Sequence, residues 1–343
     1  MIKLLIVDDS LFMRKMVREM LAGNPEIVIA GEASGGREAM DKIPLLKPDV
    51  ILLDVIMPTP DGLWTLEEIN KQAKIPVIIF SSIATPDAEI TSEIFKNGVF
   101  DAIHKPVSSA DTAAVKNELI LKIKAAGSVD KNKLAQVMID NKARARKTEH
   151  LSIPAFKVVA IGSSAGGPPA LYEVLHQLPA DLGAGVVVAQ HMPQNFIQPF
   201  AFHIEKIAQM PVKMAQDGDM VLSGRILISP AESTMTLTRL KKGGMVVLEK
   251  TPSIPRPSVD VMFASVAEAF SKNTVGVILS GMGSDGTKGL MAIKNAGGKT
   301  FSQDEKTSLV YGMPKSAAES GASQRALPLC NIAQEIVDAI KGN

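Results

Sequence analysis

Cysteine is almost absent from this chain of 343 residues, in which Cys330 is the only one. A single thiol excludes a disulfide framework within the chain, so nothing points to an oxidising compartment. No apolar run approaches the roughly 20 residues that a membrane span needs. The N-terminus turns acidic at Asp8-Asp9, which is too early for a signal peptide. We therefore expect a cytoplasmic protein with no direct membrane insertion.

An excess of charge of one sign is also lacking, since the formal net charge is +1. A balanced chain gives no reason to expect a nucleic-acid partner. What the chain does have is apolar material, because hydrophobic residues make up 46% of it. That is enough for a core in each of the two domains that a chain of this length suggests.

Residues 1–125 alternate between short apolar runs, typical of buried strands, and amphipathic stretches, typical of helices. This alternation favours an α/β domain with a doubly wound parallel sheet that has helices on both faces. In such sheets the binding site lies beyond the carboxyl ends of the strands. The predicted strands are 4–7, 27–30, 49–53, 77–80 and 102–104, and the predicted helices are 12–21, 36–46, 87–96 and 111–124.

Polar side chains follow four of these strands. Asp8 and Asp9 come after the first strand and Asp54 after the third, while Ser81 and Lys105 follow the last two. Three carboxylates at one edge would repel one another unless a cation lay among them, and their hard oxygens suit Mg²⁺. A lysine and a hydroxyl beside them suit a phosphoryl group. Any one aspartate here could merely cap a helix, but agreement at five positions favours a site.

These residues, with LDVIMP at 53–58, Asp61-Gly62 and Lys105-Pro106, resemble the receiver domain of two-component response regulators. The resemblance implies a flavodoxin-like fold in which Asp54 accepts a phosphoryl group from a CheA-type histidine kinase. It implies that Asp8, Asp9 and Asp54 hold Mg²⁺, and that Ser81 and Lys105 sense the phosphoryl group. One position differs, because Ala102 stands where receivers often carry an aromatic switch residue.

Residues 126–154 are polar and rich in charge, with a basic run at 141–147 and a proline at the end. Such a run could be a nucleic-acid or membrane patch, but it is more typical of a solvated linker. We interpret this stretch as a linker, within which 133–139 is a candidate helix.

Residues 155–343 show a second α/β alternation, which predicts another doubly wound, Rossmann-like parallel sheet. In the first strand–turn–helix unit, Gly162-x-Ser164-x-Gly166 fits the pattern of a nucleophile elbow, although a plain packing turn is the alternative. The predicted strands are 158–161, 185–189, 225–228, 245–248, 275–279 and 299–301, and the predicted helices are 169–177, 196–208, 259–270, 286–296, 313–320 and 332–340.

Two further strand ends supply partners for this serine. His191 follows the second predicted strand of the domain, and Asp285 follows the fifth. Because parallel strands end at the same edge of a sheet, we expect a triad of Ser164, His191 as general base and Asp285 as its orienting carboxylate. The glycines around Met282 make its backbone N–H a candidate oxyanion donor. The order Ser, His, Asp differs from that of the α/β-hydrolases.

This domain resembles the methylesterase domain of the CheB family of chemotaxis response regulators in IGSSAGG at 161–167, QHMP at 190–193, RPSVD at 256–260, GMGSDG at 281–286 and YGMP at 311–314. The resemblance implies hydrolysis of glutamate methyl esters, and deamidation of glutamines, on methyl-accepting chemotaxis receptors. It implies no cofactor in the esterase domain, and a receiver that restrains the esterase until it is phosphorylated.

Two positions depart from the family pattern. Ala165 stands where a threonine is usual, and no histidine lies near Thr234. A non-catalytic regulator that binds a receptor or kinase is therefore an alternative, although the three triad residues are present. A nucleotide-binding loop at 162–167 is a second alternative, but its spacing fits neither common phosphate-loop motif and no lysine follows it.

Overall fold

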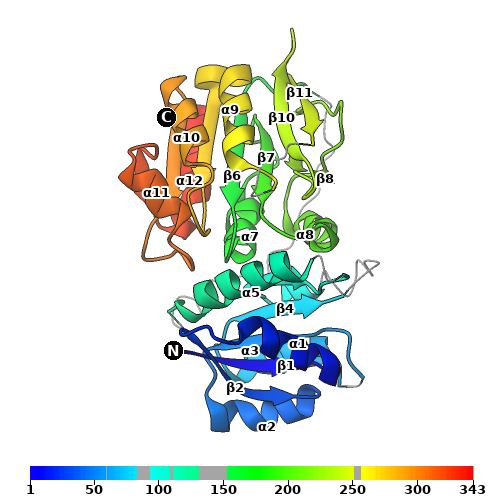
Figure 1. The fold of residues 1–343 in the computed structure, drawn as a ribbon. Coiled ribbons are helices and arrows are strands. Elements are labelled where there is room, and N and C mark those ends of the chain that lie inside the picture. Colours follow the sequence, from blue (N-terminus) through cyan, green and yellow to red (C-terminus); the bar gives the residue numbers. More distant parts are fainter. Residues whose placement is uncertain (59, 83–92, 109–110, 131–152, 251–255, 343) are drawn as a thin grey trace. The chain divides into compact units, whose positions relative to one another are not determined.

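The structure is a computed structural model that describes residues 1–58, 60–82, 93–108, 111–130, 153–250 and 256–342. The chain divides into two compact units, residues 1–139 and 140–343, and each is described by itself (Figure 1). The domain limits at 125 and 155 remain predictions. Among the described helices, none has the length and apolar content to cross a membrane.

Unit 1 is a five-stranded parallel sheet in the order β2-β1-β3-β4-β5. Because the chain moves to one side of β1 first and then to the other, right-handed crossovers put α1 and α2 on opposite faces. Helix α1 packs against α5, and α2 packs against α3. The elements are β1 (Ile2–Val7), α1 (Leu11–Leu21), β2 (Ile27–Ala33), α2 (Gly36–Leu46), β3 (Val50–Leu53), α3 (Gly62–Gln72), β4 (Val77–Ser81), β5 (Asp101–His104) and α5 (Thr112–Gly127).

Helix α3 has no counterpart among the predicted elements of unit 1. It begins after Asp61, whose carboxylate accepts a hydrogen bond of 2.9 Å from the Trp64 N–H and so caps the helix. The other described helices and all five strands agree with the predicted ones to within a few residues. Most of the predicted helix over 87–96 lies outside the described residues, as does the candidate helix over 133–139.

Unit 2 is a seven-stranded parallel sheet in the order β14-β13-β12-β6-β7-β9-β8. Helices α9 and α10 pack together, and α7 packs against α8 and α12 (Figure 1). The strands are β6 (Val158–Ser163), β7 (Gly185–Gln190), β8 (Val212–Met214), β9 (Ile226–Ile228), β12 (Thr274–Ile278), β13 (Lys299–Gln303) and β14 (Arg325–Leu327). The helices are α7 (Gly167–Gln177), α8 (Gln194–Ile207), α9 (Val259–Phe270), α10 (Thr287–Asn295), α11 (Met313–Glu319) and α12 (Leu329–Lys341).

The predicted strand over 245–248 lies in a different sheet from the one we expected. It belongs to β11 (Gly244–Glu249), which pairs antiparallel with β10 (Thr234–Arg239) in a separate two-stranded sheet. The physical reason is the short connection between the two strands, closed by a hydrogen bond of 3.1 Å from Leu240 N to Gly243 O. Parallel neighbours would need a long crossover. Strands β8, β10 and β14 were not among the predicted elements.

Candidate active site and phosphoryl site

Strand β6 lies at the point in unit 2 where the strand order reverses, since the chain continues through β7 on one side and later returns to β12 on the other. Binding sites of open α/β sheets form at such points. Ser164 directly follows β6, and its N–H donates to the Ser280 carbonyl at 3.0 Å. His191 directly follows β7, and its N–H donates to the Ser163 carbonyl at 3.1 Å. The two residues therefore leave neighbouring strands at the same edge.

His191 and Asp285 are joined through their side chains. The distance from His191 Nε2 to Asp285 Oδ2 is 2.9 Å, and the two side chains are 12% and 9% exposed. Because an ionised carboxylate can only accept, Nε2 must carry the proton, which leaves Nδ1 as the basic nitrogen. In the part of the chain that the structure describes, no hydrogen bond joins the Ser164 hydroxyl to this ring. Such contacts often tighten only when substrate binds.

Asp285 is held by the first N–H groups of helix α9. Its carboxylate accepts from Val259 N at 2.8 Å, from Asp260 N at 3.0 Å and from Gly286 N at 3.0 Å. Burial alone would raise the pKa of Asp285, but the hydrogen bonds from His191 and the α9 backbone outweigh it and lower that pKa below its ordinary value. An ionised Asp285 fixes the His191 tautomer and stabilises the imidazolium.

The role of these α9 residues was missing from the sequence interpretation. The helix start at Val259 was predicted. The first N–H groups of a helix have no partner within it, and the sequence does not show which group accepts from them. Ser258, whose hydroxyl accepts from Val261 N at 3.3 Å, marks the start of the helix but does not identify the acceptor of its first N–H groups. The carboxylate of Asp260 in turn accepts from Gly289 N of α10 at 2.8 Å. The carboxylate of Asp260 on α9 thus binds the start of α10, and the carboxylate of Asp285, which precedes α10, binds the start of α9.

The loop that carries Met282 runs alongside Ser164. A Cβ added to Gly281 would lie 3.1 Å from the Ser164 Cβ and would collide with the Met313 side chain. The Gly281 carbonyl accepts from Gly312 N at 3.0 Å and from Met313 N at 2.8 Å, which fixes the loop. Gly283 has a φ of 82°, in the left-handed region that favours glycine. Met282 is 38% exposed.

The acidic residues of unit 1 gather at the carboxyl edge of its sheet. Asp8, Asp9 and Asp54 each offer one carboxylate oxygen, and these three oxygens lie within 4.8 Å of one another. Ser81 Oγ donates to Asp54 Oδ1 at 2.8 Å, and Lys105 Nζ lies 2.7 Å from Asp8 Oδ2 and also contacts Asp54 Oδ2. Asp9 is exposed, whereas the other four are buried. The structure thus brings all five predicted residues together.

This donor set fits a hard cation such as Mg²⁺. Three carboxylates supply oxygen ligands, and the exposed Asp9 leaves access for water, which Mg²⁺ tends to retain. Burial raises the pKa of Asp8, although Lys105 opposes this. A cation among the carboxylates would likewise favour the ionised form.

Each of the two units matches a known protein family. Residues 159–336 match the family model of the CheB methylesterase, and residues 4–115 match that of the response regulator receiver domain. This chain belongs to the CheB methylesterase family. A protein-glutamate methylesterase/protein-glutamine glutaminase of Pyrococcus horikoshii is 38% identical over 99% of this chain and 94% of its own length. One from Carboxydothermus hydrogenoformans is 41% identical, over 97% and 98% of the two chains.

A solved structure supports the fold of unit 2. The crystal structure of the CheB methylesterase catalytic domain of Thermotoga maritima is 37% identical, with a TM-score of 0.52. It covers 53% of this chain and 97% of that domain. The matches to the family models confirm the predicted family. The parallel strand pairing in both sheets confirms the predicted α/β architecture of the two units.

The two departures from the family pattern fall at well-packed positions of this CheB family member. Ala165 is buried, and its carbonyl accepts from Ser280 Oγ at 2.9 Å, a bond to the backbone that does not depend on the side chain at this position. Thr234 is buried, and its hydroxyl accepts from Ser258 N at 3.2 Å. It thus supports the start of α9, which holds Asp285.

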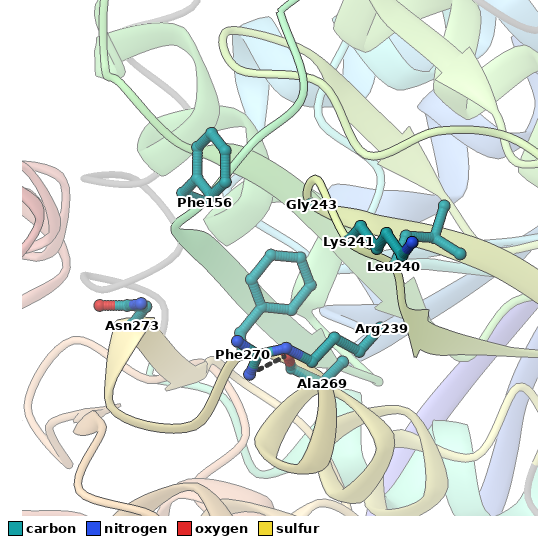
Figure 2. Close-up of a pocket in the computed structure, with 8 residues that line it drawn as sticks. All are labelled: Phe156, Arg239, Leu240, Lys241, Gly243, Ala269, Phe270 and Asn273. Atoms are coloured by element: carbon teal, nitrogen blue, oxygen red, sulfur yellow. Dashed lines mark hydrogen bonds between the residues drawn. The ribbon is translucent and has the colours of Figure 1, made fainter.

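A small pocket elsewhere in unit 2 belongs to neither site. Figure 2 shows Arg239 reaching toward the end of α9, where its Nη1 donates to the Ala269 carbonyl at 3.4 Å. The residues that line the pocket are Phe156, Arg239, Leu240, Lys241, Gly243, Ala269, Phe270 and Asn273. None of them is a predicted site residue, so we assign neither ester hydrolysis nor phosphoryl transfer to this pocket.

Proposed function

We propose that this chain hydrolyses glutamate 5-O-methyl esters on methyl-accepting chemotaxis receptors, and deamidates receptor glutamines, in the cytoplasm. We assign residues 1–125 to a receiver domain, 126–154 to a linker and 155–343 to the methylesterase domain. The observation that carries the proposal is the hydrogen bond of 2.9 Å between His191 and an ionised Asp285, at the same sheet edge as Ser164. The relatives described above bear names for both activities.

The proposed reaction uses Ser164, His191, Asp285 and the Met282 N–H, together with one water molecule. Ser164 Oγ attacks the ester carbonyl while His191 Nδ1 takes its proton, and Asp285 stabilises the imidazolium that forms. The Met282 N–H donates to the developing oxyanion. His191 then returns the proton to the leaving methoxide, which departs as methanol. Water hydrolyses the acyl-enzyme by the same route, which frees Ser164 and leaves a receptor carboxylate.

Methanol release from methylated receptor membranes tests this reaction. Ser164→Ala is expected to lower turnover at least a thousandfold, because triad members act as a unit, while the thermal unfolding midpoint stays close to that of the wild type. If Ser164→Ala kept more than a few per cent of wild-type turnover, the assignment of the nucleophile would be wrong.

For unit 1 we propose that Asp54 accepts a phosphoryl group from a CheA-type histidine kinase. Asp8, Asp9 and Asp54 would hold Mg²⁺, whose charge would offset that of the incoming group. The Ser81 hydroxyl and the Lys105 ammonium, which contact Asp54 directly, would then bind the phosphoryl oxygens.

A small phosphodonor such as acetyl phosphate tests this assignment by mass spectrometry of the intact chain. We expect one phosphoryl group per chain with Mg²⁺, and none after chelation or in Asp54→Ala. Asp61→Ala is a suitable control, because that aspartate caps α3 and is not among the proposed metal ligands. Labelling that persists in Asp54→Ala would refute the assignment.

A further inference from the structure

The side chain of Gln190, the last residue of β7, binds three groups at the ends of two strands. Its Oε1 accepts from Ser163 Oγ at 2.6 Å. Its Nε2 donates to the carbonyl of Ser164 at 2.9 Å and to the carbonyl of His191 at 2.8 Å. One amide therefore contacts the backbone of both the proposed nucleophile and the proposed base.

The orientation of this amide follows from the chemistry of its partners. A backbone carbonyl can only accept, so the nitrogen must face Ser164 and His191. The hydroxyl of Ser163 then donates to the oxygen, and both amide protons are used. Gln190 and Ser163 are fully buried, and burial of an amide is tolerated only when its hydrogen bonds are made. Rotation of the amide by half a turn would place its oxygen against two carbonyls.

The position of Gln190 in the sheet makes these bonds the outermost tie between the two strands. The pairing of β6 with β7 ends at Ser163 and Gln190, and the next residues along each strand are Ser164 and His191. Helix α7 closes the space on one side, because a side chain at Gly167 would collide with the Gln190 amide oxygen and with Ser163. The amide is therefore enclosed between its partners and the start of α7.

We infer that Gln190 is a positioning residue, whose buried amide holds Ser164 and His191 in register with each other. The inference rests on the proposed ester hydrolysis. It concerns the distance between Ser164 Oγ and the His191 ring, on which proton transfer depends. A misplacement of about 1 Å between reacting groups can cost on the order of 100-fold in rate. Gln190 itself does not touch substrate.

Gln190→Met tests this in the full chain, because methionine keeps the shape of the side chain and removes both N–H donors. The readout is the rate at which a fluorophosphonate labels Ser164, together with the final number of labels per chain. We expect labelling and methanol release to slow together by on the order of 100-fold, with KM little changed and the final stoichiometry still one. A variant that was merely less well folded would instead give fewer labels at the wild-type rate.

Ser163→Ala is the second variant, and it decides the matter should Gln190→Met not fold. It removes one of the three bonds, so we expect labelling to slow about two- to tenfold. Ser302→Ala is the matched control, since Ser302 is a buried serine on β13 whose hydroxyl makes no hydrogen bond among the described residues. Its labelling rate should equal that of the wild type.

The inference is overturned if wild-type Ser164 labels and both Gln190→Met and Ser163→Ala label equally fast. It is also overturned if only the stoichiometry falls. Absence of labelling in the wild-type chain would be a different result, because it would refute the proposed function itself.

Discussion

The hydrogen bond with His191 and those from the start of helix α9 together lower the pKa of Asp285 below its ordinary value. The sequence placed this aspartate after a strand, which was enough to predict its edge of the sheet and its partner His191. It could not predict the N–H groups of Val259 and Asp260, because backbone donors are the same in every residue. The same reason applies to Gln190 of the QHMP motif. Its amide donates to the backbone carbonyls of Ser164 and His191, and a sequence pattern of side chains cannot predict bonds to backbone carbonyls.

The lowered pKa of Asp285 predicts how stability depends on pH. The folded-state pKa lies below the ordinary value of 3.8, so ionised Asp285 stabilises the fold above pH 3.8, and this contribution is lost as the pH falls through the folded-state pKa. Asp285→Asn should therefore unfold at a lower temperature than the wild type at pH 6, and the difference should shrink toward pH 3. Calorimetry of both proteins across this range measures it. His191 and Asp260, the titratable neighbours, are present in both, and a difference independent of pH would contradict the prediction.

At the scale of elements, the apolar pattern located the central strands well and the short edge elements poorly. Strands such as β6 are buried on both faces and appear as continuous apolar runs. Strand β14 has three residues, two of them exposed, and resembles a loop in sequence. Helix α3 begins directly after Asp61, which belongs to the receiver motif and also caps the helix. The hairpin of β10 and β11 shows that a strand pattern does not by itself assign a strand to a sheet.

The turn between Asp285 and α10 offers a test at this scale. Gly286 has a φ of 91°, and a Cβ there would lie 2.7 Å from Val259 Cγ1, beside the N–H groups that hold Asp285. Gly286→Ala should destabilise the fold by about 1–3 kcal/mol through backbone strain, and should lower methanol release at least tenfold by moving Val259 away from Asp285. Denaturant unfolding and initial rates measure the two effects.

Gly321→Ala is the matched control for that variant. Gly321 has a φ of 72°, but nothing lies within 4 Å of a Cβ built on it. This substitution should cost comparable stability from strain while methanol release stays at the wild-type level. Equal loss of activity in both variants would show that the turn at Gly286 has no special role in holding Asp285.

At the scale of the whole molecule, the alternation of strands and helices was sufficient to predict two parallel sheets, and the order of the motifs was sufficient to predict the family. The alternation works because each parallel strand needs a crossover, which the chain supplies as a helix in most cases, although β8 and β9 are joined without one. The sequence says less about communication between the units, because that depends on the difference in energy between two states of the same chain. Measurement of activity with and without phosphodonor addresses this directly.

Phosphorylation of Asp54 is expected to raise the activity of the full chain. A receiver joined to an esterase acts as a switch only if its two states differ in how they restrain Ser164, and a bias of a few kcal/mol moves such an equilibrium by orders of magnitude. A fragment that begins at Ala155 should therefore release methanol faster than the unphosphorylated full chain, at least several-fold. Acetyl phosphate with Mg²⁺ should accelerate the full chain and leave the fragment unchanged. Initial rates at equal enzyme concentration provide the comparison.

The isolated domain of Thermotoga maritima, which spans the same part of the fold, supports the use of that fragment. Asp54→Ala in the full chain is the control, since it should keep the low rate whether or not the phosphodonor is present. Ala102 gives the experiment a further purpose, because it stands where an aromatic switch residue is usual and is completely buried. If the full chain still responds to the phosphodonor, the signal leaves unit 1 without an aromatic side chain at that position. A fragment no faster than the unphosphorylated chain would mean that the receiver does not restrain the esterase.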